Sequence, residues 1–382
     1  MRKKIIVCVL IISFILGGCS NKSDNSKKNN DTEFKTRNIE EDLIDEDNTQ
    51  SKKKNTDAEV KCLISSKNCK EVTAVFKDVR VVCLFEDSNT IIYTKNSKTY
   101  IGEYSMDKGI TNDGSELLVS NSSEYFLKDN KIIIVDNRRS SAIVYKYDIT
   151  DKSLVSNEIK FSEEKSYLSY DLENDYVVTF DDDKCEIVEY YADSGKVANK
   201  IKIDNNYFFT KVVKGKKGYS FCGGVIKNEN EQAIPCYGFF DFNGNIKNVQ
   251  YMDSSWAAYK NGIIVYEMTL SWTGKNKVIF LDADTFETKS VKINSDLEAK
   301  NEIRVTYDGN YLITDSSDLE KNMFSKHIYS VEDNREIENI DFTKCNDCMI
   351  YMSSMVSTKV KSLIFFSEYK SGRYEMYKYC IK

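Results

Sequence analysis

A pattern of apolar and polar positions returns about every 45 residues along the chain. Each copy follows an acidic or Asn/Gly turn. It begins with an apolar run of β-branched and aromatic residues. A polar loop follows, and a second run ends on an aromatic residue or Leu. Such runs predict β-strands, and no copy has a helical stretch. The copies are Thr90–Tyr104, Lys131–Tyr147, Asp175–Tyr191, Gly218–Phe240, Gly262–Leu281, Asn310–Tyr329 and Ser362–Tyr377.

Each copy is expected to form four strands, named a to d from the centre outward. In the third copy these are Tyr167–Leu172, Tyr176–Phe180, Glu186–Tyr191 and Val197–Ile203. The other a strands are predicted near Val79–Phe85, Tyr125–Leu127, Phe209–Val213, Trp256–Tyr259, Ile303–Tyr307 and Met349–Ser353. The a–b turns carry residues that tolerate a positive φ, namely Asp129-Asn130, Asn174-Asp175, Asn261-Gly262 and Asp308-Gly309.

Repeated strand units of this length are typical of β-propeller blades. The predicted fold is all-β, a seven-bladed β-propeller of four-stranded antiparallel blades; six or eight blades remain open if one irregular copy is miscounted. The last copy ends without a d strand, while the apolar segment Glu71–Phe76 precedes the first blade. We therefore expect residues 71–76 to complete the last blade beside Arg373–Ile381, which removes the open sheet edges.

Over about residues 70–382 the repeat pattern resembles the seven-bladed propellers of the tryptophan–aspartate-repeat and quinoprotein-like superfamily. The Gly-His and Trp-Asp dipeptides of that group are absent, and no quinone-binding residues are recognisable. The resemblance therefore implies a fold and no site residues. No cofactor is predicted.

The N-terminal residues have the pattern of a bacterial lipoprotein signal. Arg2-Lys3-Lys4 is followed by the apolar run Ile5–Leu16, which is too short to span a bilayer. Leu16-Gly17-Gly18-Cys19 then resembles a lipobox, so residues 1–18 are predicted to be a signal peptide and Cys19 to carry the lipid, palmitate included. An ordinary secretory signal with an incidental Cys is the alternative. Lipidation places the protein at the cell membrane, anchored through its N-terminal lipid and facing outside the cytoplasm.

Residues 19–58 are rich in Asn, Ser, Lys and Asp, a composition that predicts a disordered polar tether. The β-propeller domain is expected over residues 59–382. The chain has a formal net charge of -6 and no basic patch of consequence, which argues against nucleic acid as a partner.

The chain has 11 cysteines, and an extracytoplasmic location permits disulfides. Cys222 and Cys236 belong to two runs joined by a polar loop, so a bridge across a hairpin is predicted, and Cys62 and Cys69 are candidates to close a small loop. The pair Cys345/Cys348 is half of a zinc-ribbon pattern without its second half. A local disulfide or two thiols are expected there, and no metal.

The b–c and d–a loops of a propeller share one face, at the mouth of the central channel. The speculative ligand-binding residues on that face are Arg138, Arg139, Trp256, Tyr259 and Trp272. An exposed aromatic pair is a platform for sugar rings or an anchor for a partner protein, although both tryptophans are also candidates for local core. The polar segment Ser316–Lys326 is read as a long loop on the same face.

Catalytic signals are weak. The single histidine, His327, falls within a predicted strand and is taken as structural, which leaves no evident Ser-His-Asp machinery. No Gly-rich phosphate loop is present. The predicted function is therefore a membrane-anchored binding or scaffold module for a protein, peptide or glycan, with an unknown envelope protein or glycan as partner. The alternative is a carbohydrate hydrolase or lyase that uses channel-facing carboxylates.

Overall fold

The computed structural model describes residues 69–77, 79–120, 123–162, 165–226, 233–251, 277–292, 304–318, 323–343, 348–352, 354–357, 360–369 and 373–381. The chain divides into two compact units, Met1–Asp57 and Ala58–Lys382, and all described residues belong to the second. Within the described ranges, no helix has the length and apolar character needed to cross a membrane.

The described residues form seven β-sheets. The first sheet contains β25 (Ser354–Val356), β2 (Arg80–Phe85), β3 (Thr90–Lys95), β4 (Lys98–Ser105) and β5 (Gly109–Leu117), and the 3₁₀ turn η2 (Glu86–Ser88) joins β2 to β3. The second contains β6 (Glu124–Lys128), β7 (Lys131–Asn137), β8 (Ser141–Asp148) and β9 (Leu154–Lys160). The third contains β10 (Lys165–Asp171), β11 (Tyr176–Asp181), β12 (Glu186–Tyr191) and β13 (Val197–Lys202).

The fourth sheet contains β14 (Tyr207–Lys214), β15 (Gly218–Val225), β16 (Ile234–Asp241) and β17 (Ile246–Tyr251), and the fifth contains β18 (Lys277–Asp282) and β19 (Glu287–Lys292). The sixth contains β20 (Arg304–Val305), β21 (Tyr311–Asp318), β22 (Met323–Ser330) and β23 (Arg335–Thr343). The seventh contains β24 (Cys348–Met352), β26 (Ser362–Tyr369), β27 (Arg373–Cys380) and β1 (Cys69–Lys77).

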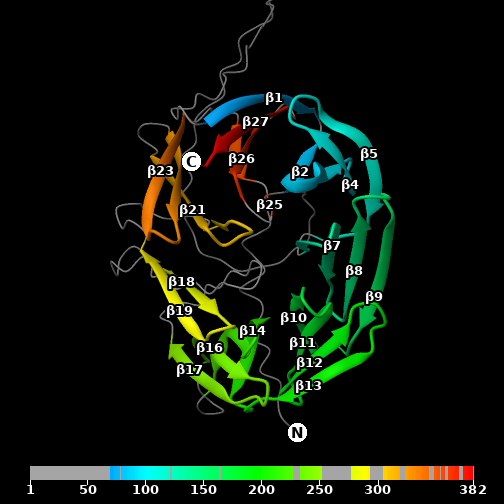
Figure 1. Cartoon of the computed structure of the whole chain (residues 1–382), viewed down its shortest axis with the longest axis vertical. Coiled ribbons are helices and arrows are strands. Elements are labelled where there is room, and N and C mark those ends of the chain that lie inside the picture. The colour runs from blue at the N-terminus through cyan, green and yellow to red at the C-terminus, as the bar shows by residue number, and fades with distance from the viewer. Residues whose placement is uncertain are drawn as a thin grey trace, which may run out of the picture. The chain divides into compact units, whose positions relative to one another are not determined.

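The sheets follow one another around a ring, as Figure 1 shows within the second unit. One cluster of buried apolar side chains lies between each sheet and the next. The cluster of Ile91, Tyr93, Ile364 and Met376 joins the last sheet to the first. These contacts close the ring, so the described residues build a β-propeller in which each pair of neighbouring blades has its own core.

The expected count of seven four-stranded blades is corrected for the described part of the chain, where five sheets have four strands. The first sheet has five strands because β25 pairs in parallel with β2. The fifth sheet has two strands within the described residues, and the expected strand Trp256–Tyr259 lies outside them. The all-β propeller of antiparallel blades is confirmed, and the count of seven stays a prediction.

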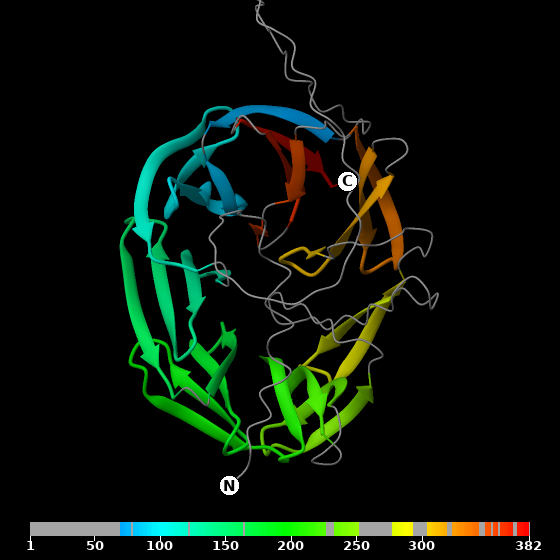
Figure 2. The same ribbon diagram turned by 180° about the vertical axis from the view of Figure 1, so that it is seen from behind.

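The prediction that an N-terminal strand completes the last sheet is confirmed. β1 pairs antiparallel with β27, with Glu71 opposite Tyr377 and Val72 opposite Met376. The reverse view shows this blue N-terminal strand against the red C-terminal strand (Figure 2). The first and last strands of the described residues are thereby held in one sheet, and β27 has no open edge.

The predicted turn chemistry is confirmed where it is described. Asp129 and Asn130 have φ values of 47° and 63°, and Asp175 has a φ of 61°. Asp308-Gly309 places the glycine at a φ of 73°. Short polar residues and glycine adopt this left-handed conformation at low cost. The turn Asn261-Gly262 lies outside the described residues.

The prediction that Ser316–Lys326 forms a long loop is wrong. β21 continues to Asp318 and β22 starts at Met323, so the polar residues on either side pair as strands. Thr, Ser and Asp side chains are compatible with a strand when they hydrogen-bond across the sheet, as Ser325 does to Asp341 over 2.6 Å.

Candidate functional site

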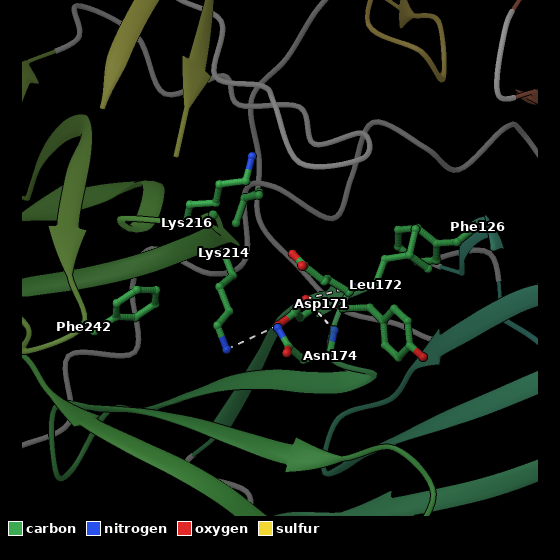
Figure 3. Close-up of a pocket in the computed structure, with 11 residues that line it drawn as sticks. Phe126, Asp171, Leu172, Asn174, Lys214, Lys216 and Phe242 are labelled. Carbon is green, nitrogen blue, oxygen red and sulfur yellow. Dashed lines mark hydrogen bonds and ion pairs between the residues drawn. The ribbon is translucent and has the colours of Figure 1, made fainter. Parts of the chain in front are cut away.

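A pocket of about 430 Å³ opens where the inner strands β10 and β14 end. Its walls come from three successive sheets and from the turn between β16 and β17. Figure 3 shows Phe126 at one end of the pocket and Phe242 at the other, with Lys214 and Asp171 between them. The lining residues are Phe126, Tyr170, Asp171, Leu172, Glu173, Asn174, Val213, Lys214, Gly215, Lys216 and Phe242.

The β10–β11 turn is held in shape by Asp171. One carboxylate oxygen accepts hydrogen bonds from the backbone N–H groups of Glu173 and Asn174, over 3.1 and 3.2 Å. The other accepts from the side-chain amide of Asn174 over 2.9 Å. Lys128 of the preceding sheet donates to the carbonyl oxygens of Leu172 and Glu173, over 2.7 and 2.9 Å. This wall of the pocket is therefore fixed by both its own turn and its neighbour.

A buried charge network lies behind the opposite wall. Lys214 Nζ is 2.8 Å from Glu189 Oε1 and 3.4 Å from Asp171 Oδ2. Tyr219 donates its hydroxyl to the same Glu189 oxygen over 2.7 Å, and Lys214 lies 5.0 Å from the ring centre of Tyr176. These residues come from β10, β11, β12, β14 and β15, so the network ties the third sheet to the fourth.

The network keeps Lys214 charged. Burial acts to lower the pKa of Lys214, but the hydrogen bond and charge of Glu189, followed by Asp171, outweigh burial and raise it. The pKa of Tyr219 is also raised, first by burial and then by the charge of Glu189. A lysine held protonated cannot act as a general base, so Lys214 serves as a fixed cation beneath the pocket.

The rim of the pocket combines charge and an exposed ring. Glu173 is exposed on the β10–β11 turn. Lys216 forms an ion pair of 2.9 Å with Asp284, and its side chain is 79% exposed. Phe242 is 44% exposed although it is a large apolar side chain. At the base, the rings of Phe126 and Tyr170 lie 5.4 Å apart between centroids.

This arrangement is suited to binding. Its size is within the range of ligand pockets, roughly 300–1,000 Å³, and it offers apolar rings with a few fixed polar groups. Asp171 is occupied by turn hydrogen bonds and by Lys214. A carboxylate held in this way is poorly placed to exchange protons with a substrate.

The pocket opens on the face opposite to the one expected. In an antiparallel blade the a–b and c–d turns share one edge, and the pocket is built from the a–b turns after β10 and β14 and the c–d turn after β16. Sequence reasoning missed it, although one signal was present. Glu189 stands between Val188 and Tyr190 in a fully buried stretch, and a charged residue there requires a partner from another element.

Arg138 and Arg139 are exposed in the β7–β8 turn, on the face expected from the sequence. Arg138 Nε is 2.9 Å from the buried carboxylate of Asp136, and its Nη2 donates to the Leu118 carbonyl over 3.0 Å. Burial acts to raise the pKa of Asp136, but hydrogen bonds from Ser120 and Arg138 outweigh it and lower that pKa. Arg138 thus neutralises a buried acid of its own chain, which argues against a role as a ligand-binding cation.

The other speculative ligand residues, Trp256, Tyr259 and Trp272, lie outside the described residues, as do Cys19 and Cys62. Cys69 is the first residue of β1, opposite Tyr379. The proposed roles of the three aromatic residues, of Cys19 and of the pair Cys62/Cys69 stay predictions. Within the described ranges, no group of three or more His, Cys, Asp or Glu side chains is arranged to hold a metal ion.

The predicted bridge between Cys222 and Cys236 is corrected, because both are free thiols. Cys222 is opposite Tyr237, whereas Cys236 is opposite Gly223. Side chains alternate between the two faces of a strand, so the two thiols point to opposite faces of the sheet and pack in different cores. Burial raises the pKa of Cys222, and it raises that of Cys236 to about 12.

No protein-family model matches the sequence, and no curated protein matches it. Among solved structures, virginiamycin B lyase from Staphylococcus aureus with quinupristin has a TM-score of 0.45 at 9% identity, over 84% of this chain and 100% of that chain. Oligogalacturonate lyase in complex with manganese has a TM-score of 0.44 at 11% identity, over 84% and 98%.

The dihydro-heme d1 dehydrogenase NirN has a TM-score of 0.40 at 10% identity, over 70% of this chain and 58% of that chain. The chain therefore spans less than two thirds of NirN. These likenesses concern the fold alone. The assignment of a propeller depends on the sheet topology and on the cores between the sheets.

Proposed function

We propose that the protein is a membrane-anchored extracytoplasmic lipoprotein whose propeller binds a peptide or glycan fragment. The anchor is the lipid on Cys19, and residues 19–58 hold the domain away from the membrane. Support comes from the lipobox Leu16–Cys19 and the polar composition after it. The bound partner belongs to the cell envelope.

We further propose that the ring has seven blades. Seven sheets within the described residues and the seven cores between them support this number. The missing strands of the fifth blade are the predicted segments Trp256–Tyr259 and Gly262 onward.

The ligand is proposed to occupy the pocket between the β10–β11 and β14–β15 turns. The observation that carries this proposal is the combination of Phe126, Tyr170 and Phe242 with the charged groups Glu173 and Lys216 at the rim. Aromatic rings contribute apolar contact and stacking, and the rim charges orient polar groups of the ligand. A peptide side chain or a sugar ring has both kinds of surface.

A hydrolase or lyase that uses carboxylates in this pocket is the less favoured function. Such an enzyme needs two carboxyl groups about 5–10 Å apart that are free to act as acid, base or nucleophile. Asp171 instead accepts three hydrogen bonds and pairs with Lys214. A scaffold in an envelope complex fits the anchor and the fold, but it gives the pocket no role.

Binding is tested by probing the folded domain with a peptide array and an oligosaccharide array. Glu173→Trp should fill the pocket and weaken binding of a selected probe at least about tenfold, which is about 1.4 kcal/mol. Glu158→Trp, the same change at an exposed position of β9, is the matched control and should leave binding unchanged. Equal affinities of wild type and Glu173→Trp for every probe would remove the pocket as the site. Co-purification of an envelope complex without any array ligand would favour the scaffold.

A further inference from the structure

The single histidine of the chain lies between a serine and a glutamate on the sixth sheet. Ser316 Oγ of β21 is 2.8 Å from His327 Nε2 of β22. His327 Nδ1 is 2.9 Å from Glu336 Oε1 of β23. With the proton on Nδ1, the His327 ring donates a hydrogen bond to Glu336 and accepts one from the Ser316 hydroxyl at Nε2. These are the contacts that make a serine nucleophilic in Ser-His-acid enzymes.

Strand register brings the three side chains to one face of the sheet. Thr314 is opposite His327, and Ser316 follows two residues later on β21, so it points the same way. On β23 the register shifts between Ile328 and Tyr329, and Glu336 is therefore opposite Tyr329. Without this β-bulge the apolar Ile337 would take that position. Bulges often re-aim a side chain in this way near functional sites.

Among the described residues, Thr314 Oγ1 has no hydrogen-bond partner although Thr314 is only 3% exposed. A buried hydroxyl without a partner costs free energy, so it calls for an explanation. Thr314 is directly opposite His327 and shares its face with Ser316. Its O–H is therefore available as a donor to an oxygen atom that enters beside the serine.

Ser316 and His327 lie beyond the apolar part of that face, and Glu336 lies beside its edge, opposite Tyr329. Leu312 and Tyr329 pack with Val278 and Phe280 of the fifth sheet. Ser316 lies further along β21 and is partly exposed, whereas His327 is 7% exposed. A shielded base next to a partly exposed hydroxyl is the usual arrangement of an activated nucleophile.

We propose that Ser316, His327 and Glu336 form a nucleophilic triad that cleaves carboxylic acid esters, with Thr314 as an oxyanion donor. Ser316 is the nucleophile, His327 the general base and then the general acid, and Glu336 the residue that holds the Nδ1–H tautomer. This activity is independent of ligand binding in the pocket, which is built from other sheets.

The reaction needs only the ester and water. Ser316 Oγ attacks the carbonyl carbon while its proton passes to His327 Nε2. The bond to the alcohol oxygen then breaks, and Nε2 returns the proton to the leaving alcohol. Water attacks the acyl-serine with His327 again accepting a proton, the acyl–Oγ bond breaks, and Oγ recovers its proton as the carboxylic acid leaves. No oxidant or reductant takes part.

The test is labelling of the full chain with a fluorophosphonate, followed by peptide mapping of the wild-type adduct. We expect the adduct on Ser316, and none at this position in Ser316→Ala. His327→Gln should slow labelling at least about a hundredfold, since general bases contribute roughly 10²–10⁴-fold. The rate of p-nitrophenyl acetate hydrolysis should fall in the same variants, His327→Gln and Ser316→Ala.

Ser325→Ala is the matched control, since Ser325 is opposite Ser316 and donates to Asp341 over 2.6 Å. The fluorophosphonate should label Ser316 in the Ser325→Ala variant at the wild-type rate. Circular dichroism verifies that each variant is folded, and the wild-type peptide map decides the matter even if a variant does not fold. A folded wild-type chain without an adduct on Ser316 would overturn the proposal. So would labelling of His327→Gln at the wild-type rate, because the histidine would then have only a structural role.

Discussion

Glu189 belongs to the buried charge network behind the candidate site. It is fully buried, and its Oε1 accepts from Lys214 and Tyr219. Among the described residues its Oε2 has no hydrogen-bond partner. The ion pair with Lys214 thus compensates much of the cost of burying this carboxylate. The pair also sets the position of the cation beneath the pocket.

Removing Lys214 leaves that carboxylate buried without its counterion. Lys214→Met should therefore lower the free energy of unfolding by about 3–5 kcal/mol, measured by urea denaturation. Lys216→Met is the control, because its pair with Asp284 is exposed to solvent and its loss should destabilise the fold far less. The double variant Lys214→Met/Glu189→Gln should recover part of the loss. Equal effects of the two single lysine variants would show that the buried pair does not stabilise the fold.

At the scale of elements, the β16–β17 turn carries Phe242 to the rim of the pocket. Asp241 holds this turn, since it accepts from the backbone N–H groups of Asn243 and Asn245 over 2.9 and 3.1 Å. Hydrogen bonds from Asn245 and Lys247 are the main cause of a pKa well below the ordinary value of Asp241. The folded state therefore favours the ionised form of Asp241.

The turn should weaken in acid. A carboxyl group with a lowered pKa in the folded state stabilises that state above its unfolded pKa of 3.8, and this contribution disappears as the pH falls through the folded pKa. Thermal denaturation of wild type and Asp241→Asn between pH 7 and pH 2 measures it. The wild type should be the more stable near pH 7, with the difference shrinking below about pH 4. A difference that is constant with pH would contradict the role given to Asp241.

β1 is the element on which closure depends. It pairs with β27 in the last sheet, although the two strands come from opposite ends of the propeller unit. Removing it exposes the hydrogen-bonding edge of β27 and opens a sheet to other chains. A chain that begins at Val79 should therefore unfold at lower temperature and associate, compared with one that begins at Ala58. Light scattering and a thermal scan measure both effects, and identical behaviour of the two chains would contradict closure by β1.

Local patterns determined what could be predicted at this scale. The strands of the third sheet match their predicted ranges within two residues, because alternation and turn residues act over short distances. The polar residues around Ser316 predict a loop, although they lie in β21, because a polar run does not reveal its cross-strand partners. The bulge that brings Glu336 opposite Tyr329 depends on pairing, which the order of residues does not display.

At the scale of the whole propeller unit, closure was predictable because a missing strand and a surplus strand stood at opposite ends of the repeat. The pocket was not. Lys214 and Glu189 belong to different sheets, and only the packing of the third sheet against the fourth brings them together. Cys222 and Cys236 show the same limit, since a shift of one position in register separates two thiols that are close in the sequence.

The most direct test of the proposed binding site is hydrogen–deuterium exchange of the propeller with and without a ligand selected on the arrays. Binding in the pocket should slow exchange at residues 171–176 and 213–218, which form the two turns that line it. Residues 137–141, in the β7–β8 turn on the opposite face, should exchange as before. Protection confined to residues 137–141, with both pocket turns unchanged, would contradict the assignment of the binding site to the β10–β11 and β14–β15 turns.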